Sequence, residues 1–289
     1  MVRFLLIAVL ICGFFVSAFA THNRAGEITY RHLSGLTYEV TITTCTKTSV
    51  IADRTYLKIN WGDVPIGAEL DSLERTSITF LGGLDAQINT YVGTHTYGGP
   101  GIFDLSVEDP NRNSGVLNIE NSVDQIFCIA SQLIITPQSG HNNSVVLLNP
   151  AKEQACVFKN WIHNPGAYDP DGDLLVYSLV PSMGGDYNED GIGCDPIPGF
   201  IFPQFYSPNN DIFEIDPVTG DLTWITPQVV GEYNVGIKIE EWRMVNGTLM
   251  KVGHVIRDMQ INVLLCTNNP PEITAIADTC VEANSSFGF

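Results

Sequence analysis

The stretch Tyr38-Glu39-Val40-Thr41-Ile42-Thr43 places an apolar or aromatic side chain at every second position. This period is typical of a strand that buries one face, whereas a helix repeats its apolar residues every three or four positions. Similar short runs, rich in β-branched and aromatic residues and bounded by Gly, Pro, Asn or Asp, recur along the chain. Long segments with helical periodicity are missing, so the sequence predicts an all-β protein.

The expected strands fall into two groups separated by a turn-rich region near residue 150. The chain is too long for one small sandwich and suits two, so we predict tandem immunoglobulin-like β-sandwiches. The first group comprises residues 27–32, 37–44, 55–61, 77–80, 101–107 and 132–136, and the second comprises 174–179, 212–215, 222–225, 233–242, 248–255 and 258–265.

The N-terminus has the features of an export signal. Arg3 precedes an apolar run, and Ser17-Ala18-Phe19-Ala20 offers the small residues that a signal peptidase reads. A membrane anchor is the alternative, but the apolar core is short for a span. We therefore expect a secreted or cell-surface protein, with a signal peptide at 1–20, a first sandwich at 21–145, a second at 146–266, and a linker with the start of a further repeat at 267–289.

The chain is strongly acidic, with 14 Lys and Arg against 32 Asp and Glu and a net charge of −18. Nucleic acids and anionic lipids bind to basic patches, so this balance argues against both as partners. We expect no nucleic-acid partner and no membrane insertion after signal cleavage. The charge suits a protein that works among divalent cations, and an acidic surface that merely confers solubility is the alternative.

An even number of cysteines remains once the signal is removed. In an exported chain this favours disulfides, although the sequence leaves many connectivities open, and no Cys-x-x-Cys suggests a zinc ribbon or a redox site. Because each pair falls inside one expected domain, we predict that Cys45 pairs with Cys128 and Cys156 with Cys194. The six cysteines are Cys45, Cys128, Cys156, Cys194, Cys266 and Cys280.

Acidic turns provide candidate metal ligands. In Asp169-Pro170-Asp171-Gly172-Asp173 three carboxylates alternate ahead of an apolar strand, and such carboxylates converge when a cation or open water relieves their repulsion. Calcium is the candidate cofactor, and Asp169, Asp171 and Asp173 are its candidate ligands. The alternative is a solvated turn whose Asp side chains accept hydrogen bonds from backbone N–H groups.

A second acidic turn matches the first half of a calcium loop. Asp186, Asn188 and Asp190 alternate and are followed by Gly191, where the chain must bend sharply. Position twelve is Ile197 instead of the bidentate Glu of an EF-hand, which argues against that motif. A different calcium site completed by Asp195 remains an alternative, and a weaker acidic turn spans residues 216–221.

Motifs in the first unit resemble polycystic-kidney-disease (PKD) type immunoglobulin-like domains. Asn60-Trp61-Gly62-Asp63 is similar to the tryptophan-glycine-aspartate turn of those domains. His95-Thr96-Tyr97, followed by Pro100-Gly101 and an alternating strand, is similar to their later signature. The stretch from Tyr56 to Asp109 carries this likeness, which implies an immunoglobulin-like sandwich.

The second unit resembles cadherin-like and related bacterial immunoglobulin-like repeats. The shared order is an acidic turn and strand at 169–177, a hairpin with Thr219-Gly220 at its tip, and Gly231-Glu232-Tyr233. In such repeats calcium lies between domains, which implies the same three Asp ligands. The segment Thr21–Tyr30 also resembles the mature start of surface proteins of gliding Bacteroidetes that use type IX secretion.

The chain shows none of the common local motifs of enzymes. A His-Glu-x-x-His helix, a Gly-x-Ser-x-Gly elbow, a P-loop and a dinucleotide fingerprint are all missing from the sequence, so we expect no catalytic residues and no enzyme. We expect an extracellular structural or adhesive module that contacts a protein or polysaccharide surface. Alternatives are a carbohydrate-binding accessory module, with Trp161, Trp242 and loop tyrosines as its platform, and a self-associating fibre subunit.

Overall fold

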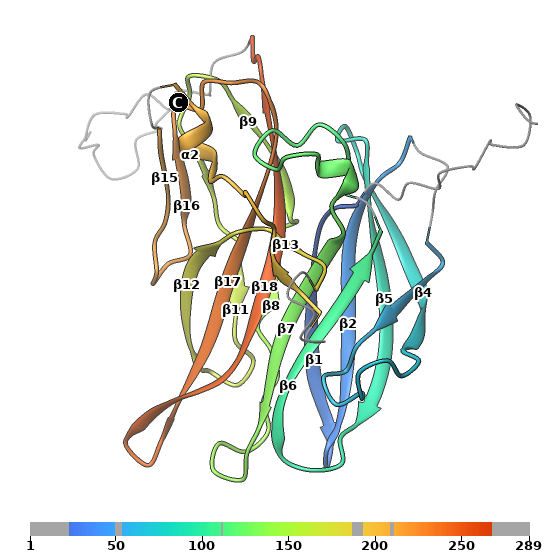
Figure 1. Cartoon of the computed structure of the whole chain (residues 1–289). Helices are drawn as coiled ribbons and strands as arrows, with labels where there is room; N and C mark the ends of the chain where they lie inside the picture. The colour runs from blue at the N-terminus through green and yellow to red at the C-terminus, as the bar shows by residue number, and fades with distance from the viewer. Residues whose placement is uncertain (1–22, 50–53, 111, 187–192, 209–210, 268–289) are drawn as a thin grey trace, which may run out of the picture.

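The computed structural model describes residues 23–49, 54–110, 112–186, 193–208 and 211–267. In these residues nearly all regular structure is β, as Figure 1 shows. The helical segments among them are the single turns η1 (Ser122–Asp124) and α2 (Pro203–Tyr206). The prediction of an all-β protein is confirmed.

The first half of the chain forms an antiparallel sheet and a pair of strands that packs against it. In β2, the alternating side chains Tyr38, Val40 and Ile42 are fully buried, as the sequence predicts. They join a core that includes Trp61 and the inward side chains of the covering strands. The sheet has the order β1 (Asn23–Ser34), β2 (Thr37–Lys47), β5 (Ala86–Thr96), β4 (Asp71–Leu81) and β3 (Tyr56–Ile59), and the covering pair is β6 (Gly101–Asp109) and β7 (Phe127–Ile135).

The second half has its own apolar core around Trp224, between a three-stranded sheet and a long hairpin. The hairpin turns at Asn246 and Gly247, which both have positive φ. The expected strands 248–255 and 258–265 are one continuous strand, a correction that follows from the absence of any turn residue between them. The elements are β12 (Leu174–Val180), β17 (Gly231–Val245) and β18 (Thr248–Leu264), with β10 (Trp161–His163), β16 (Leu222–Ile225) and β15 (Ile212–Ile215) in the small sheet.

Several short elements were not expected from the sequence. Strand β9 runs parallel to β18, and two pairs of two-residue strands link the loops. Each is too short to show a period in the sequence. They are β8 (Val146–Leu147), β9 (Lys152–Cys156), β11 (Ala167–Tyr168), β13 (Met183–Gly184) and β14 (Asp195–Pro196). The three-residue β10 and the longer β5 were not expected either.

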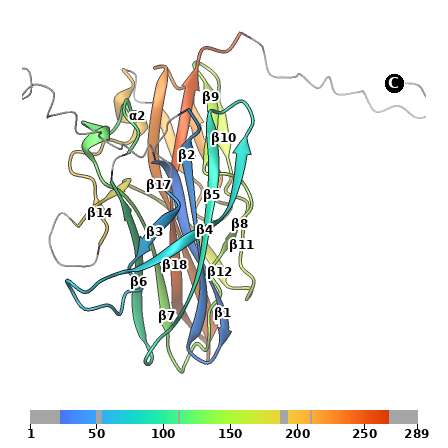
Figure 2. The same cartoon turned by 90° about the vertical axis from the view of Figure 1, so that its right-hand side faces the viewer.

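Strand β18 belongs to both halves. It forms ladders with β17 and β9 of the second half and with β1 and β7 of the first half, with Gly26 opposite Asp258 and Gln132 opposite His254. One sheet therefore continues from β12 through β17, β18, β1 and β2 to β3. Figures 1 and 2 show β17 and β18 alongside β7 and β1. Backbone hydrogen bonds thus join the halves.

The two faces of β18 have opposite chemistry. Met259, Ile261 and Val263 belong to the second apolar core, whereas the alternating Asp258 and Gln260 enter a polar layer and are also buried. Burying such groups is tolerated only when they are hydrogen-bonded, and here they are. We call this set the buried polar layer; it consists of Arg24, Arg112, Asn113, Asn234, Asp258 and Gln260.

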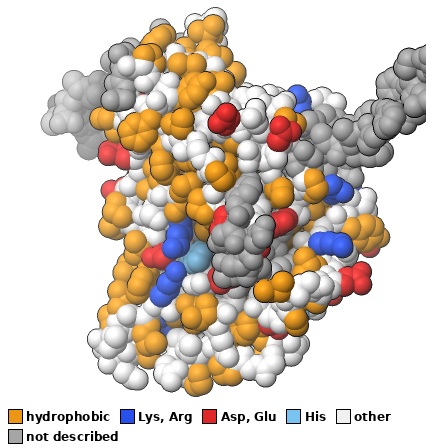
Figure 3. All heavy atoms as spheres, viewed as in Figure 1, with side chains coloured by type: hydrophobic (Ala, Val, Ile, Leu, Met, Phe, Trp, Pro, Cys, Tyr) orange, Lys and Arg blue, Asp and Glu red, His pale blue; other side chains and the backbone are white. Residues whose placement is uncertain are grey.

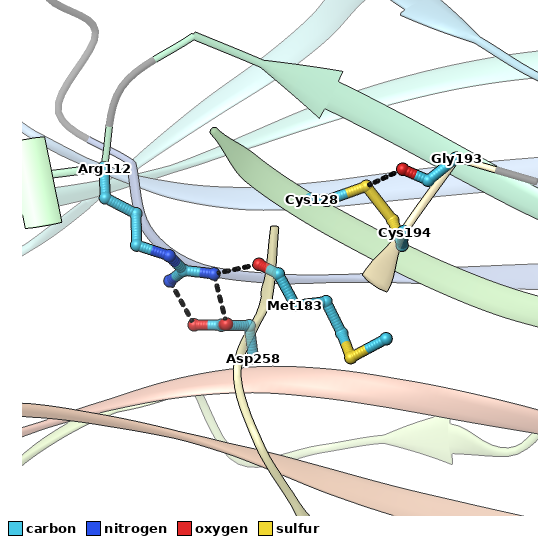
Figure 4. The surroundings of a disulfide bond; sticks show 6 residues. All are labelled: Arg112, Cys128, Met183, Gly193, Cys194 and Asp258. Carbon is cyan, nitrogen blue, oxygen red and sulfur yellow. Dashed lines mark hydrogen bonds and ion pairs between the residues drawn. A yellow bond between two sulfur atoms is a disulfide. The ribbon is translucent and has the colours of Figure 1, made fainter. Parts of the chain in front are cut away.

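The centre of the buried polar layer is the ion pair between Arg112 and Asp258. The Arg112 guanidinium donates to both carboxylate oxygens of Asp258, at 3.0 and 2.7 Å, and to the carbonyl oxygen of Met183 at 2.7 Å (Figure 4). Asn234 donates to the same carboxylate at 2.7 Å and to the carbonyl oxygen of Arg24 at 2.6 Å. These contacts hold β1, β17 and β18 together.

The disulfides differ from the predicted pairs. Cys128 is bonded to Cys194, with Cα atoms 5.7 Å apart (Figure 4), and Cys156 is bonded to Cys266, with Cα atoms 5.6 Å apart. Cys45 is buried and forms no disulfide with another described cysteine. The predicted pairs, Cys45 with Cys128 and Cys156 with Cys194, are therefore wrong: Cys128 bonds to a cysteine of the other half, and Cys156 bonds within the second half, to the cysteine that follows the parallel strand β18. Cys280 lies outside the described residues.

Candidate functional site

The acidic turn at 169–173 brings its carboxylates together as predicted. One oxygen each of Asp169, Asp171 and Asp173 lies within 4.8 Å of the others. Within the turn, Asp169 Oδ1 accepts hydrogen bonds from the backbone N–H groups of Asp171 at 2.8 Å and Asp173 at 3.0 Å. Gly172 has a φ of +82°, which bends the chain between the acids. The turn thus has both of the features that were considered as alternatives: its carboxylates converge, and Asp169 accepts hydrogen bonds from backbone N–H groups.

Arg243 of β17 supplies the positive charge at this turn. Its guanidinium donates to both oxygens of Asp173, at 2.7 and 2.5 Å, and to Asp171 Oδ2 at 2.9 Å. It also donates to the carbonyl oxygens of Ser139 and His141. Charge-assisted, bidentate contacts of this kind are the strong ones. The cation that relieves the repulsion among the three acids is therefore a side chain.

The hydrogen bonds leave little room for calcium in this arrangement. Both oxygens of Asp171 and of Asp173 accept hydrogen bonds, as does Asp169 Oδ1, while Asp169 Oδ2 is buried without a partner. Burial raises the pKa of Asp169; the carboxylate charges of Asp173 and Asp171 add to this effect, and hydrogen bonds from the backbone N–H groups of the same two residues partly offset it. Calcium needs six to eight oxygens, so the residues as placed do not fit the ion.

Replacing Arg243 with glutamine is expected to create a calcium response. In the wild-type chain we expect the same thermal midpoint in calcium and in chelator, because the guanidinium already neutralises the acids. In Arg243→Gln the freed carboxylates would bind the ion, and binding at 100 times Kd adds about 2.7 kcal/mol to stability. Thermal unfolding at fixed ionic strength measures both. Arg31→Gln is the matched control, and a calcium-dependent midpoint in the wild type would contradict the expectation.

The other acidic turns do not converge on a metal site within the described residues. Asp186 lies at the edge of the described segment, and Asn188 and Asp190 lie outside it. Asp195 belongs to β14. Asp216 accepts hydrogen bonds from the backbone N–H groups of Val218 and Thr219, which lower its pKa. The turn at 216–221 is therefore a capped hairpin turn.

A fully buried carboxylate, Glu241, was missed by the sequence analysis. It accepts hydrogen bonds from the backbone N–H of Val145, from Asn142 Nδ2 at 2.7 Å and from the Tyr30 hydroxyl at 3.4 Å. Space for it exists because residue 253 is glycine, where a Cβ atom would collide with Tyr30 and Glu241. The adjacent Glu240 is a surface residue, so the pattern of charges alone does not distinguish them.

Burial makes Glu241 a source of pH dependence. It raises the pKa of Glu241 from 4.5 to about 8, so between these values the folded state binds a proton that the unfolded state has released. Stability is therefore expected to fall as pH rises from 6.5 to 8, by up to about 1.4 kcal/mol per pH unit. Chemical denaturation at several pH values measures the slope. In Glu241→Gln the slope in this window should vanish, and an unchanged slope would contradict the assignment.

The residues proposed as a sugar platform are divided between core and surface. Trp161 is buried, which corrects the expectation for it, Trp242 is half-buried, and the loop tyrosines Tyr168 and Tyr206 are exposed. Trp61 and Trp224 are buried in the two cores. In the first unit Trp61 stacks on His95 with ring centroids 4.9 Å apart, and the Tyr97 hydroxyl donates to the Trp61 carbonyl oxygen. The motifs that resemble PKD domains therefore meet in one core.

The described surface has two cavities of similar size. The first, about 470 Å³, lies between β3, β6 and the loop after β3, and its lining includes Lys58, Val64, Ile66, Leu70, Glu108 and Ile126. The second, about 430 Å³, is lined by the acidic turn at 171–174 and by Trp242, Arg243, Met244 and Leu249. Among the described residues no aromatic side chain lines the first cavity, so these residues offer no surface there on which sugar rings stack. Figure 3 shows apolar side chains gathered around α2 and β15, where Phe205 is 64% exposed.

Comparisons with known proteins give no family. No protein-family model, no curated protein and no solved structure matches the chain. None of the helices in the described part of the chain is long and apolar enough to cross a membrane. Two disulfides are typical of proteins in an oxidising compartment. The assignment of function therefore rests on the geometry above.

Proposed function

We propose that the chain is a rigid structural and adhesive module of a secreted or cell-surface protein. Its architecture is that of two immunoglobulin-like β-sandwiches fused through a common sheet. The observation that carries the proposal is β18, which forms ladders with strands of both halves. A module that transmits force or holds binding surfaces at a distance needs such a joint, because a flexible linker would let the units move independently.

The chemistry of the joint supports a rigid module. Arg257 of β18 donates to both oxygens of Glu27 on β1, at 2.8 and 2.9 Å, and both side chains are buried. The buried polar layer and the Cys128–Cys194 disulfide lie in the same region (Figure 4). Calcium is not required for stiffness in this proposal, since backbone ladders and side-chain ion pairs do the joining.

The proposed adhesive surface is an exposed apolar area. The apolar area around α2 and β15 includes Phe205 and Ile212, both at least half exposed. Exposed apolar areas of this kind often contact other proteins. Pairing of β12 with another copy is disfavoured, because the backbone N–H of Tyr177 on its outer edge donates to the carbonyl oxygen of Pro217.

One cooperative unfolding transition is the expected result for a rigid module. Calorimetry of the chain from residue 21 onward, with disulfides intact, should give one peak whose calorimetric and van't Hoff enthalpies agree. Pulling on single molecules should give one rupture event for both halves. Two separated transitions would show that the halves unfold independently and would overturn the proposed rigid joint.

A further inference from the structure

The most unusual side chain in the joint is a buried lysine that faces two carboxamides. Lys152 on β9 is 1% exposed, and its Nζ lies 2.8 Å from Gln260 Oε1 and 3.1 Å from Asn262 Oδ1. Both amides belong to β18, the parallel neighbour of β9. Lysine is almost never fully buried without a charged partner, yet among the described contacts its hydrogen-bond acceptors are neutral amides.

We propose that Lys152 and Asn262 form a covalent amide bond between β9 and β18, with release of ammonia. The Lys152 amine attacks Asn262 Cγ, so that the new N–C bond forms while the bond from Cγ to Nδ2 breaks. The nitrogen that leaves takes up the proton that the lysine gives up. No oxidant or reductant is needed, because an amide replaces an amide.

The surroundings favour the amine as a nucleophile. Burial and, to a lesser extent, the nearby Arg24 lower the pKa of Lys152 to about 8, so part of the population is neutral at physiological pH. A neutral, desolvated lysine is an activated nucleophile. Gln260 positions it, because its Oε1 accepts from Lys152 while its Nε2 donates to Asn113 and Asn234. This fixed contact supplies the proximity that the step requires.

Asn262 is the better acceptor of the two amides. Gln260 is fully buried, and its side-chain Oε1 also accepts a hydrogen bond from Arg24 at 2.8 Å. Its Nε2 donates to two further residues, so both atoms of the side-chain amide are already bonded. Asn262 is only half-buried, which gives ammonia a way out. It lies opposite Glu232 on β17, whose carboxylate accepts from Arg24 and Asn113 and provides a base for proton relay.

Intact-mass spectrometry of the purified, reduced and unfolded full chain tests the proposal directly. We expect the mass to fall below the sequence mass by one ammonia, and fragmentation should place the linkage between Lys152 and Asn262. The Lys152→Arg and Asn262→Ala variants should each have the mass calculated from their sequence. The Lys58→Arg variant, a control at another lysine, should still be lighter than its calculated mass by one ammonia. Glu232→Gln should slow or prevent the loss of ammonia.

Three results would overturn the proposal. The first is a wild-type chain whose mass equals its sequence mass, and this measurement does not depend on any variant folding. A linkage to Gln260 would refute the assigned acceptor. A deficit located at Asn246-Gly247, where ring closure of an asparagine also releases ammonia, would show that the loss occurs elsewhere. The proposal does not depend on the adhesive function, since a crosslinked strand pair is measured by mass alone.

Discussion

Replacing Asp258 with alanine is expected to lower the free energy of unfolding by about 3 to 5 kcal/mol. Asp258 is 2% exposed and receives two hydrogen bonds from Arg112 and one from Asn234. Removing the carboxylate would leave the Arg112 guanidinium buried without its countercharge. Breaking one side of such a pair costs far more than the pair contributes, because the remaining charge is desolvated.

Chemical denaturation in the linear-extrapolation regime measures this loss. The control is Glu39→Ala, which removes an ion pair whose partner Arg31 is 63% exposed and which is expected to cost less than about 1 kcal/mol. A double variant, Arg112→Met with Asp258→Leu, should recover much of the stability, because neither charge of this pair is then buried alone. If Asp258→Ala cost no more than Glu39→Ala, the buried polar layer would not hold the halves together.

The sequence could predict the strands whose alternation separates a core face from a solvent face. Strand β2 is such a case, since Tyr38, Val40 and Ile42 are buried and the residues between them are partly exposed. The same rule fails at β18. Asp258 and Gln260 alternate with apolar residues and would be placed in water by pattern alone, yet both are buried. Because the contact between the halves is made by buried polar residues, the hydrophobic pattern of the sequence does not predict it.

In the candidate sites too, contacts within a short turn could be predicted from the sequence, whereas contacts between distant strands could not. The convergence of Asp169, Asp171 and Asp173 follows from a turn of five residues and could be predicted. Their counterion, Arg243, lies 70 residues from Asp173 on another strand. The disulfide partners are likewise set by the shared sheet, which brings Cys156 and Cys266 to the ends of the parallel strands β9 and β18. Local patterns therefore predict that the three carboxylates converge, but they do not supply the counterion or the disulfide partners.

Removing the Cys156–Cys266 disulfide is the other change with a large expected effect. The bond closes a loop with a sequence separation of 110 residues, and the chain-entropy relation gives a stabilisation of about 4.8 kcal/mol for such a loop. The loss arises mainly in the unfolded state, which gains conformations when the link is removed. We therefore expect the double variant Cys156→Ser and Cys266→Ser to unfold at a much lower denaturant concentration than the wild type.

The Cys156–Cys266 disulfide joins the C-terminal ends of the parallel strands β9 and β18. Cys156 is the last residue of β9 and pairs in register with Leu264, just before the chain leaves β18. Cys45→Ala is the matched control, because Cys45 is a buried cysteine outside any disulfide and its replacement removes only one sulfur atom. We expect that control to cost about 1 kcal/mol, as a small change in a packed core does. A double serine variant as stable as Cys45→Ala would show that the ladder between β9 and β18 needs no covalent link, and that the disulfide adds no constraint to the unfolded chain.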